Sequence, residues 1–156
     1  SQTFNGNLGG LDGAGAKGSE AAASAKLPGK YKAWLSDDKI TADSRLVHSM
    51  VPYLLPNMQV VAVDWPDLVD GFLKHAIDVN ELKLAMPGLG SNCSEETLVW
   101  TGTESNGDGT GSNCDDWVTA KAQATVGNFR QVDQDWTQTC LVNCSNPARL
   151  YCVEQP

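Results

Sequence analysis

The sequence predicts an α+β domain in which helices come first and short antiparallel strands follow. Two helical segments are expected in the first half, one from Asp12 to about Lys26 and one beginning at Asp64. The second half instead holds short apolar runs such as Leu98–Trp100, separated by long polar loops. Helices and strands that are segregated along the chain are typical of α+β folds with antiparallel pairing. No internal repeat or linker divides the 156 residues, so we expect a single domain over residues 1–156.

The first helix is expected to be rich in alanine and closely packed. Asp12 is the candidate N-cap, because a carboxylate can accept hydrogen bonds from the free amides of the first turn. The dipeptide Pro28-Gly29 ends the helix. Gly18 lies near the middle, where glycine costs about 1 kcal/mol relative to alanine and therefore requires an explanation. The segment Lys30–Leu35 alternates between two faces and predicts a strand.

Two short elements and the second helix are expected in the middle of the chain. Asp43 or Ser44 caps a short helical piece, and Val60–Val63 is a compact buried strand. The second helix has Asp64 as its cap and Pro66 in its first turn. Its inner face is expected to consist of the apolar residues at helical spacing, Leu68, Val69, Phe72, Leu73 and Ala76.

The second half is organised around a polar segment between Leu98 and Trp117. The segment begins with an apolar run, ends at Cys114 and Trp117, and contains four glycines between Trp100 and Cys114. Such a segment cannot bury itself, so it is expected to be a surface loop held at both ends by the core. The other expected features are a loop at Met86–Ser94, strands at Asp116–Val118 and Leu150–Val153, a turn at Ala124–Arg130 and an irregular run at Cys140–Pro147.

The net charge of −8 restricts the classes of partner. Nucleic acids, heparin-like polyanions and anionic membranes are not expected as general partners, because like charges repel. No apolar run approaches the ~20 residues that a membrane-spanning helix needs, so no transmembrane segment is expected. Acidity of this kind favours solubility in an extracellular setting.

The five cysteines predict disulfides and one free thiol. None of them forms a CxxC motif, and the two histidines are far from them in sequence, so the spacing of a zinc site is missing. Disulfides in an oxidising compartment are the better interpretation. The odd number leaves one cysteine unpaired, and spacing alone leaves the pairing open.

The sequence offers a few candidate chemical groups. Asn106, Asp108 and Thr110 present oxygen atoms at alternate positions, as does the front of a calcium-binding loop. The closing Glu is absent because Trp117 occupies its position, so a simple turn is the alternative and no cofactor is expected. Trp136 lies in a polar run and is the candidate exposed aromatic anchor, with a core position as the alternative. No nucleophile signature is present, so an enzyme is not expected.

The order of several motifs resembles a known family. VWTGTESNGDGTGSNCDDW, WTQTC and CSNPARLYCVEQ resemble the end of the endostatin domain of basement-membrane collagens, and more closely the endostatin-like outer-membrane proteins of Leptospira and its relatives. FNGNLGGLDGAGAK, LPGKYKAWLSD and VAVDWPDL fit the front of the domain, so the resemblance runs from Phe4 to Gln155. It implies a C-type-lectin-like (endostatin-like) fold, with two helices flanking a small, mostly antiparallel sheet and long loops.

The resemblance also implies a disulfide pattern. One family disulfide corresponds to Cys114–Cys144, which encloses 29 residues (144 − 114 − 1). The other would join Cys152 to the first helix, but Gly18 stands where the family has cysteine. Cys152 is therefore expected to be a buried free thiol. The remaining pair is Cys93–Cys140, and the rival pairing is Cys93–Cys144 with Cys114–Cys140.

By the same resemblance, the function is that of a non-enzymatic bacterial binding module. The leptospiral relatives bind host matrix and complement-regulatory proteins, so adhesion to a protein or glycan ligand is expected. The location would be secreted or cell-surface, in the outer membrane or periplasm, with a lipid anchor possible upstream. The alternatives are a carbohydrate- or calcium-binding lectin, although the EPN, QPD and WND signatures are absent, and a structural envelope protein without a ligand. The expected contact residues are Glu104, Asn106, Asp108, Asn113 and Trp136.

Overall fold

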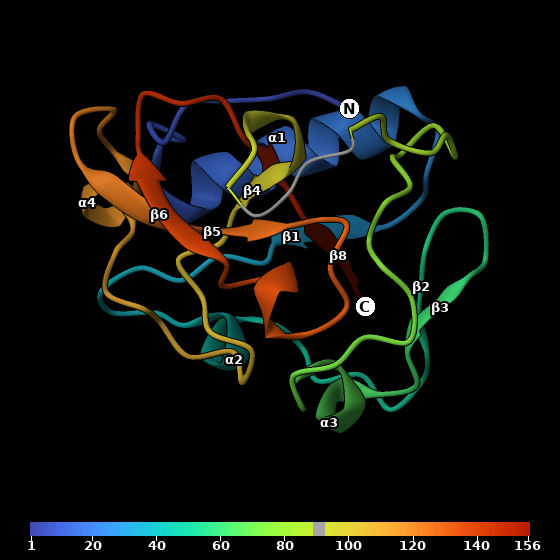
Figure 1. The fold of residues 1–156 in the computed structure, drawn as a ribbon. Coiled ribbons are helices and arrows are strands. Elements are labelled where there is room, and N and C mark those ends of the chain that lie inside the picture. Colours follow the sequence, from blue (N-terminus) through green and yellow to red (C-terminus); the bar gives the residue numbers. More distant parts are fainter. Residues whose placement is uncertain (89–92) are drawn as a thin grey trace.

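The computed structural model describes residues 1–88 and 93–156, and Figure 1 shows its fold. Within these residues a single long helix, α1 (Gly10–Ser24), lies beside three small sheets. The mixture of helix and mostly antiparallel strands confirms the expected α+β class. The two-stranded sheets pair β1 (Lys30–Ala33) with β8 (Cys152–Gln155), and β2 (Tyr53–Leu54) with β3 (Val60–Ala62).

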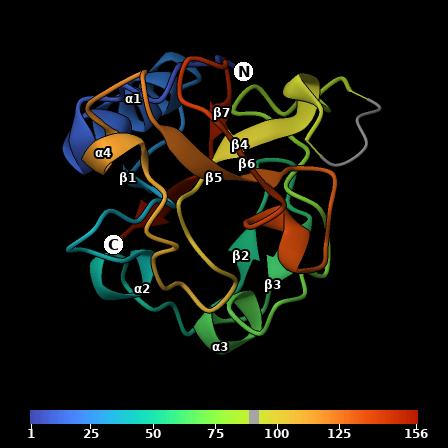
Figure 2. The same ribbon diagram turned by 60° about the vertical axis from the view of Figure 1, so that its left-hand side comes forward.

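The third sheet has the strand order β6-β5-β4-β7. β5 is antiparallel to both of its neighbours, whereas β4 and β7 are parallel. Figure 2 shows α1 at one end of the molecule, and β2 and β3 at the other. The strands are β4 (Leu98–Trp100), β5 (Gln123–Asn128), β6 (Cys140–Asn143) and β7 (Arg149–Leu150).

The first expected helix is present as α1, but its cap differs from the prediction. Gly9 occupies the N-cap with a φ of 82° and makes no side-chain bond, while Asp12 lies in the first turn. The Asp12 carboxylate still stabilises the helix there, by facing the positive end of its dipole. Gly18 is buried against β8, where an added Cβ would lie 2.3 Å from the Cys152 sulfur. This close approach explains a glycine inside the helix.

The expected second helix is wrong beyond its first turn. α3 (Trp65–Leu68) begins as predicted, with the Asp64 carboxylate accepting from Asp67 N at 3.0 Å. The chain then turns at Gly71, where φ is 99°, and Leu73 N donates to the Val132 carbonyl. Phe72, assigned to the inner face, is 67% exposed. Tertiary hydrogen bonds therefore replace the helical bonds that the apolar spacing favoured.

The short elements between α1 and α3 follow the prediction in part. α2 (Ala42–Arg45) is capped by Thr41, whose hydroxyl accepts from Ser44 N, so Asp43 is not the cap and Ser44 serves at the third helical position. β3 was expected to be fully buried. Only its second and third residues are buried, whereas Val60 and the following Val63 are exposed.

Two expectations for the second half are wrong, because segments expected to be a turn and an irregular run are paired strands. The segment expected as a turn at Ala124–Arg130 is largely strand β5, and Gly127 lies within it. A Cβ on Gly127 would lie 2.0 Å from the Trp136 carbonyl oxygen, so glycine permits a close approach here. The run expected to be irregular at Cys140–Pro147 begins with strand β6, which pairs with β5.

The strand expected at Asp116–Val118 is also wrong. The chain forms α4 (Cys114–Trp117), a short turn in which all four residues have φ between 55° and 63°. The closing strand is present, divided between β7 and β8 at Tyr151. Of the loop expected at Met86–Ser94, residues 89–92 lie outside the described part of the chain.

Among the residues that the structure describes, the core consists of two apolar clusters. One contains Trp34, Trp65, Trp136 and Tyr151 and lies toward the β2–β3 hairpin. The other is built around Trp100 and lies between α1 and the four-stranded sheet. The five tryptophans of the chain are all buried, so aromatic packing supplies much of the apolar area that folding removes from water.

Candidate functional site

The loop between β4 and α4 has a buried base. Thr101 and Thr103, at its start, are fully buried. Trp34 Nε1 donates to Thr137 Oγ1 at 2.8 Å, and the Thr137 hydroxyl donates to the Thr103 carbonyl at 2.9 Å. The Ser36 and Thr103 hydroxyls are bonded at 2.9 Å. We call Ser36, Thr101, Thr103 and Thr137 the hydroxyl network. Its polar atoms are satisfied internally, as buried polar groups must be.

Contacts farther along also fix the loop. The Gly107 carbonyl accepts from Asp43 N at 3.0 Å, so the middle of the loop is bonded to α2. At its far end Trp117 Nε1 donates to the Ser36 carbonyl at 2.8 Å. The loop is therefore held at its start, middle and end, and its conformation is set before any partner arrives.

The tip of the loop presents part of the expected contact set. Asn106 and Asp108 are exposed, and Glu104 is partly exposed. Asn113 is buried instead, so it is not available to a partner. Its Oδ1 accepts from Asp116 N at 3.0 Å and its Nδ2 donates to an Asp38 carboxylate oxygen at 2.7 Å. Asn113 therefore caps α4.

Trp136 is buried rather than exposed, which corrects its assignment as a binding anchor. Its side chain is 1% exposed, and its ring lies 5.0 Å from that of Trp34 and 5.7 Å from that of Tyr151, between centroids. Asp133, Gln134 and Gln138 are exposed, whereas the ring enters the core. Polar neighbours in sequence therefore do not predict an exposed ring.

The three residues considered for calcium are bonded to one another or to the sheet. Asn106 Oδ1 accepts from Asp108 N, and Asn106 Nδ2 donates to Asp108 Oδ2, each at 3.0 Å. The Thr110 hydroxyl accepts from Thr125 Oγ1 at 2.9 Å. The bond from Asp108 N to Asn106 Oδ1 forms an Asx turn, so the Asn/Asp/Gly pattern has a structural role. Among residues 1–88 and 93–156 no three His, Cys, Asp or Glu side chains are grouped as metal ligands.

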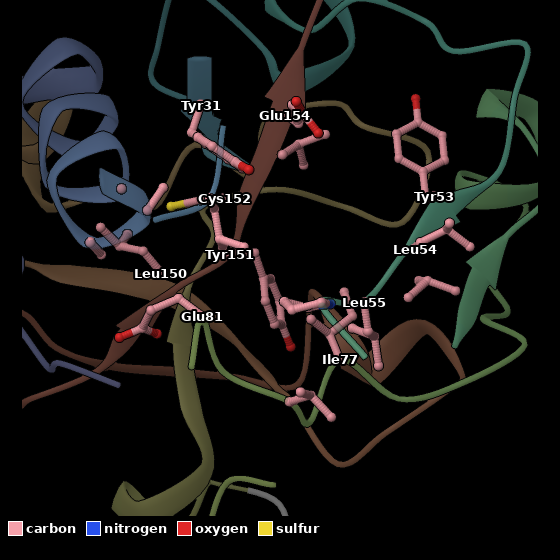
Figure 3. Close-up of a pocket in the computed structure, with 18 of the residues that line it drawn as sticks. Tyr31, Tyr53, Leu54, Leu55, Ile77, Glu81, Leu150, Tyr151, Cys152 and Glu154 are labelled. Atoms are coloured by element: carbon pink, nitrogen blue, oxygen red, sulfur yellow. The ribbon is translucent and has the colours of Figure 1, made fainter. Parts of the chain in front are cut away.

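A cleft that the sequence did not predict lies between β8 and the β2–β3 hairpin, with a volume of about 890 Å³ (Figure 3). Tyr53 and Leu54 lie across it from Glu154, and Ile77 and Tyr151 line it below. Small-molecule sites typically have volumes of ~300–1,000 Å³ and mostly apolar walls. One signal was present in the sequence, since residues 47–63 include no Asp, Glu, Lys or Arg.

Cys152 is the free cysteine, as expected, although the residue as a whole is partly buried rather than fully buried. Its sulfur points toward Gly18 of α1, on the side of β8 that the helix covers. Burial raises the pKa of the Cys152 thiol to about 12. At neutral pH the group is a protonated thiol, and a thiol reacts only through its thiolate. This cysteine is therefore poorly suited to nucleophilic chemistry.

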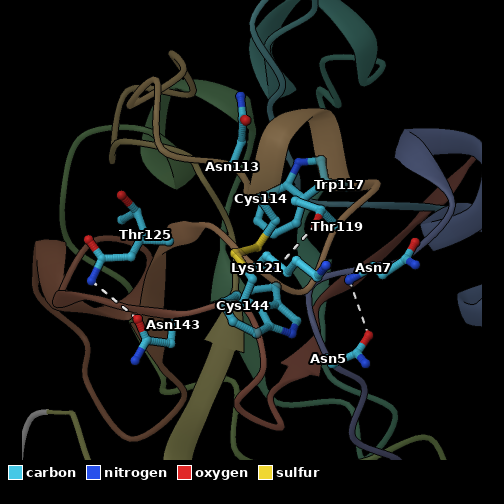
Figure 4. The surroundings of a disulfide bond; sticks show 12 residues. Asn5, Asn7, Asn113, Cys114, Trp117, Thr119, Lys121, Thr125, Asn143 and Cys144 are labelled. Atoms are coloured by element: carbon cyan, nitrogen blue, oxygen red, sulfur yellow. Dashed lines mark hydrogen bonds between the residues drawn. A yellow bond between two sulfur atoms is a disulfide. The ribbon is translucent and has the colours of Figure 1, made fainter.

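Both expected disulfides are present, and the rival pairing is wrong. Cys114–Cys144 joins α4 to the end of β6 and lies in the core beside Trp117 (Figure 4). Gly6 packs directly on it, since a Cβ there would lie 2.1 Å from the Cys114 sulfur. Cys93–Cys140 joins the start of β6 to the chain that precedes β4. Together the two bonds hold both ends of β6.

Comparisons with known proteins leave the family open. No family model matches the chain, and no curated protein matches its sequence. In the part of the chain that the structure describes, no helix has the length and apolar character needed to span a membrane. The disulfides are compatible with an extracellular location, because such bonds form and persist in oxidising compartments.

Proposed function

We propose that this chain is a non-enzymatic extracellular binding module of C-type-lectin-like (endostatin-like) fold, which adheres to matrix proteins through the tip of the β4–α4 loop. The observation that carries this proposal is the combination of an exposed polar tip with a fixed base. Glu104, Asn106 and Asp108 project from a segment that the hydroxyl network and α2 hold in place. A preformed loop loses little conformational entropy on binding, which favours affinity.

The charge around the tip indicates the chemistry of the partner. Asp43 lies against Gly107, and Asp38 is joined to the end of the loop through Asn113. With Glu104 and Asp108 this makes the face acidic. A basic surface on the partner would complement it and steer association, so binding should weaken as ionic strength rises.

Two further features support the fold part of the proposal. α1 packs on the sheet of β1 and β8, which brings the beginning and the end of the domain together. The disulfide Cys114–Cys144 is the one that the resemblance implies. Gly18 also packs against the free Cys152, at the place where the family has its second disulfide.

Charge reversal at the tip tests the proposal. The protein is applied to an array of purified extracellular-matrix proteins and glycans, and the dissociation constant is measured for each protein that binds. Glu104→Lys combined with Asp108→Lys should weaken binding at least tenfold. The control, Glu20→Lys with Glu95→Lys, makes the same change of net charge on exposed residues outside the loop. Unchanged binding by the loop variant, or an equal loss in the control, would show that the tip is not the contact.

A further inference from the structure

The geometry points to a second binding site in this chain, for an unbranched alkyl or acyl chain, in the cleft between β8 and the β2–β3 hairpin. None of the residues that line the cleft belongs to the β4–α4 loop. The site is therefore separate from the proposed adhesive contact and does not depend on it.

The part of the rim formed by residues 47–63 is apolar and exposed, whereas Lys17, Lys83 and Glu154 line other parts of the cleft. Met50 is 84% exposed, Met58 72% and Val51 66%, and Leu54 on β2 is 45% exposed. All four lie in residues 47–63, the run that contains no Asp, Glu, Lys or Arg. Contiguous apolar residues on a surface mark an interaction site, and methionine adapts its shape to ligands of different form.

The interior of the cleft continues this apolar surface into the core. Leu55, Val79 and Tyr151 are less than 10% exposed, line the cleft and belong to the core cluster around Trp34. Ile77 is a partly buried member of the same wall. An alkyl chain that enters at the rim would therefore contact the apolar side chains of this core cluster.

Several polar groups at the edge of the cleft already have partners inside the protein. The Tyr31 hydroxyl donates to the Pro28 carbonyl at 3.0 Å, and the Tyr53 hydroxyl accepts from Ser49 N at 3.0 Å. Glu81 is paired with the amino group of Ser1 at 2.7 Å. An alkyl chain makes no hydrogen bonds, so its entry would leave these bonds intact.

The outer edge of β8 lies beside the cleft and presents backbone groups. Trp34 N donates to the Tyr151 carbonyl, so the antiparallel register turns the backbone groups of Cys152 and Glu154 away from β1. Of these groups, the Glu154 carbonyl already accepts from the side chain of Gln155 at 3.0 Å. The Cys152 amide and carbonyl and the Glu154 amide also face this edge, so a peptide strand is the rival occupant, whereas an alkyl chain requires no backbone partner.

A chain-length series tests the inference with the intact protein. The neutral fluorescent probe N-phenyl-1-naphthylamine is bound to the protein and displaced by n-alkanols from hexanol to dodecanol. Burial of each methylene is worth about 0.8 kcal/mol, which is about fourfold in affinity, so octanol to decanol should improve binding about fifteenfold. Neutral alkanols avoid any contribution from the charge of the ligand.

Exposed residues of the rim provide variants that do not disturb the core. Met50→Glu and Leu54→Glu place a charge at the mouth and should each weaken decanol binding at least tenfold. The matched control is Val118→Glu, because Val118 is 54% exposed and does not line the cleft. Its affinity for decanol should stay within twofold of the unchanged protein.

Three results would overturn the inference. The first is no displacement of the probe by any alkanol, the second is an affinity that does not depend on chain length, and the third is an equal loss of affinity in Val118→Glu. If alkanols do not bind, and Leu54→Glu disrupts a dimer or abolishes binding to phosphatidylcholine vesicles, the rim is a contact between copies or with a lipid surface.

Discussion

Replacing Gly18 with alanine separates helix propensity from tertiary packing. In an isolated helix this change would stabilise by about 1 kcal/mol, because glycine loses more backbone freedom on folding than alanine. In this protein the new methyl group would lie 2.3 Å from Cys152 Sγ and 3.1 Å from Cys152 Cβ. The first distance is well inside van der Waals contact, so the Cys152 side chain would have to rotate or α1 and β8 would have to move apart.

The relative sizes of these two effects decide whether Gly18→Ala stabilises or destabilises the protein. Overpacking a core typically costs about 1–3 kcal/mol, against a gain of about 1 kcal/mol in helix propensity. We therefore expect Gly18→Ala to destabilise the protein, by up to about 2 kcal/mol. Removing the sulfur reverses the balance, because the nearest atom of residue 152 is then its Cβ. In a Cys152→Ala background, Gly18→Ala should destabilise much less or even stabilise.

A double-mutant cycle measures this coupling. The free energy of unfolding of the four proteins is obtained from urea denaturation, followed by tryptophan fluorescence with the disulfides intact. The two substitutions should couple by at least 1 kcal/mol, as contacting residues commonly do. Additivity within about 0.3 kcal/mol would refute the contact between Gly18 and Cys152, as would a stabilising effect of Gly18→Ala alone.

Four other predictions follow from the core, the disulfides and the free thiol. Replacing both Cys114 and Cys144 with serine should lower the free energy of unfolding in urea by about 3.5 kcal/mol, the chain-entropy value for a 29-residue loop, and a loss below about 1 kcal/mol would contradict it. Thr137→Val should cost about 1–3 kcal/mol in the same assay, because it leaves the Trp34 Nε1 group buried without its partner; an unchanged midpoint would contradict it. Cys152 should resist Ellman's reagent at pH 8 when folded and react in urea, since burial raises its pKa to about 12. The raised pKa has a further consequence, because the thiol ionises near pH 9 only when unfolded. Stability relative to Cys152→Ala should therefore fall as pH rises from about 9 to 12, by about 1.4 kcal/mol per unit, and a parallel pH profile would contradict this.

Features with a local cause could be predicted from the sequence. The start of α3 depends on the Asp64 carboxylate and the proline that follows Trp65, both of which act within one turn. Strand β1 follows from alternation over four residues, and α1 from its alanines. In each case neighbours in sequence supply the decisive interactions. The odd number of cysteines likewise requires one free thiol, however the other four are paired.

The errors occur where a distant segment decides the local structure. Gly127 reads as a turn, but it is a strand residue over which the Trp136 carbonyl passes. Phe72 fits a helical period, but Gly71 redirects the chain toward Val132 before the helix can continue. Trp136 has polar neighbours in sequence, and its aromatic partners, Trp34 and Tyr151, lie elsewhere in the chain.

In the candidate site, too, the locally determined features could be predicted and those that depend on distant segments could not. The sequence located the polar tip of the β4–α4 loop, because Asn, Asp and Gly at alternate positions form local turns. It could not show that the base of the loop is buried, since the hydroxyl network joins Ser36, Thr103 and Thr137 from three separate segments. The cleft is formed by β2 and β8, which are about a hundred positions apart in the chain. One feature of the rim was visible in the sequence. Residues 47–63 are seventeen consecutive residues without Asp, Glu, Lys or Arg, in a chain of net charge −8. A fully solvated hairpin would be expected to carry charged side chains, so this run indicates a surface that contacts something apolar.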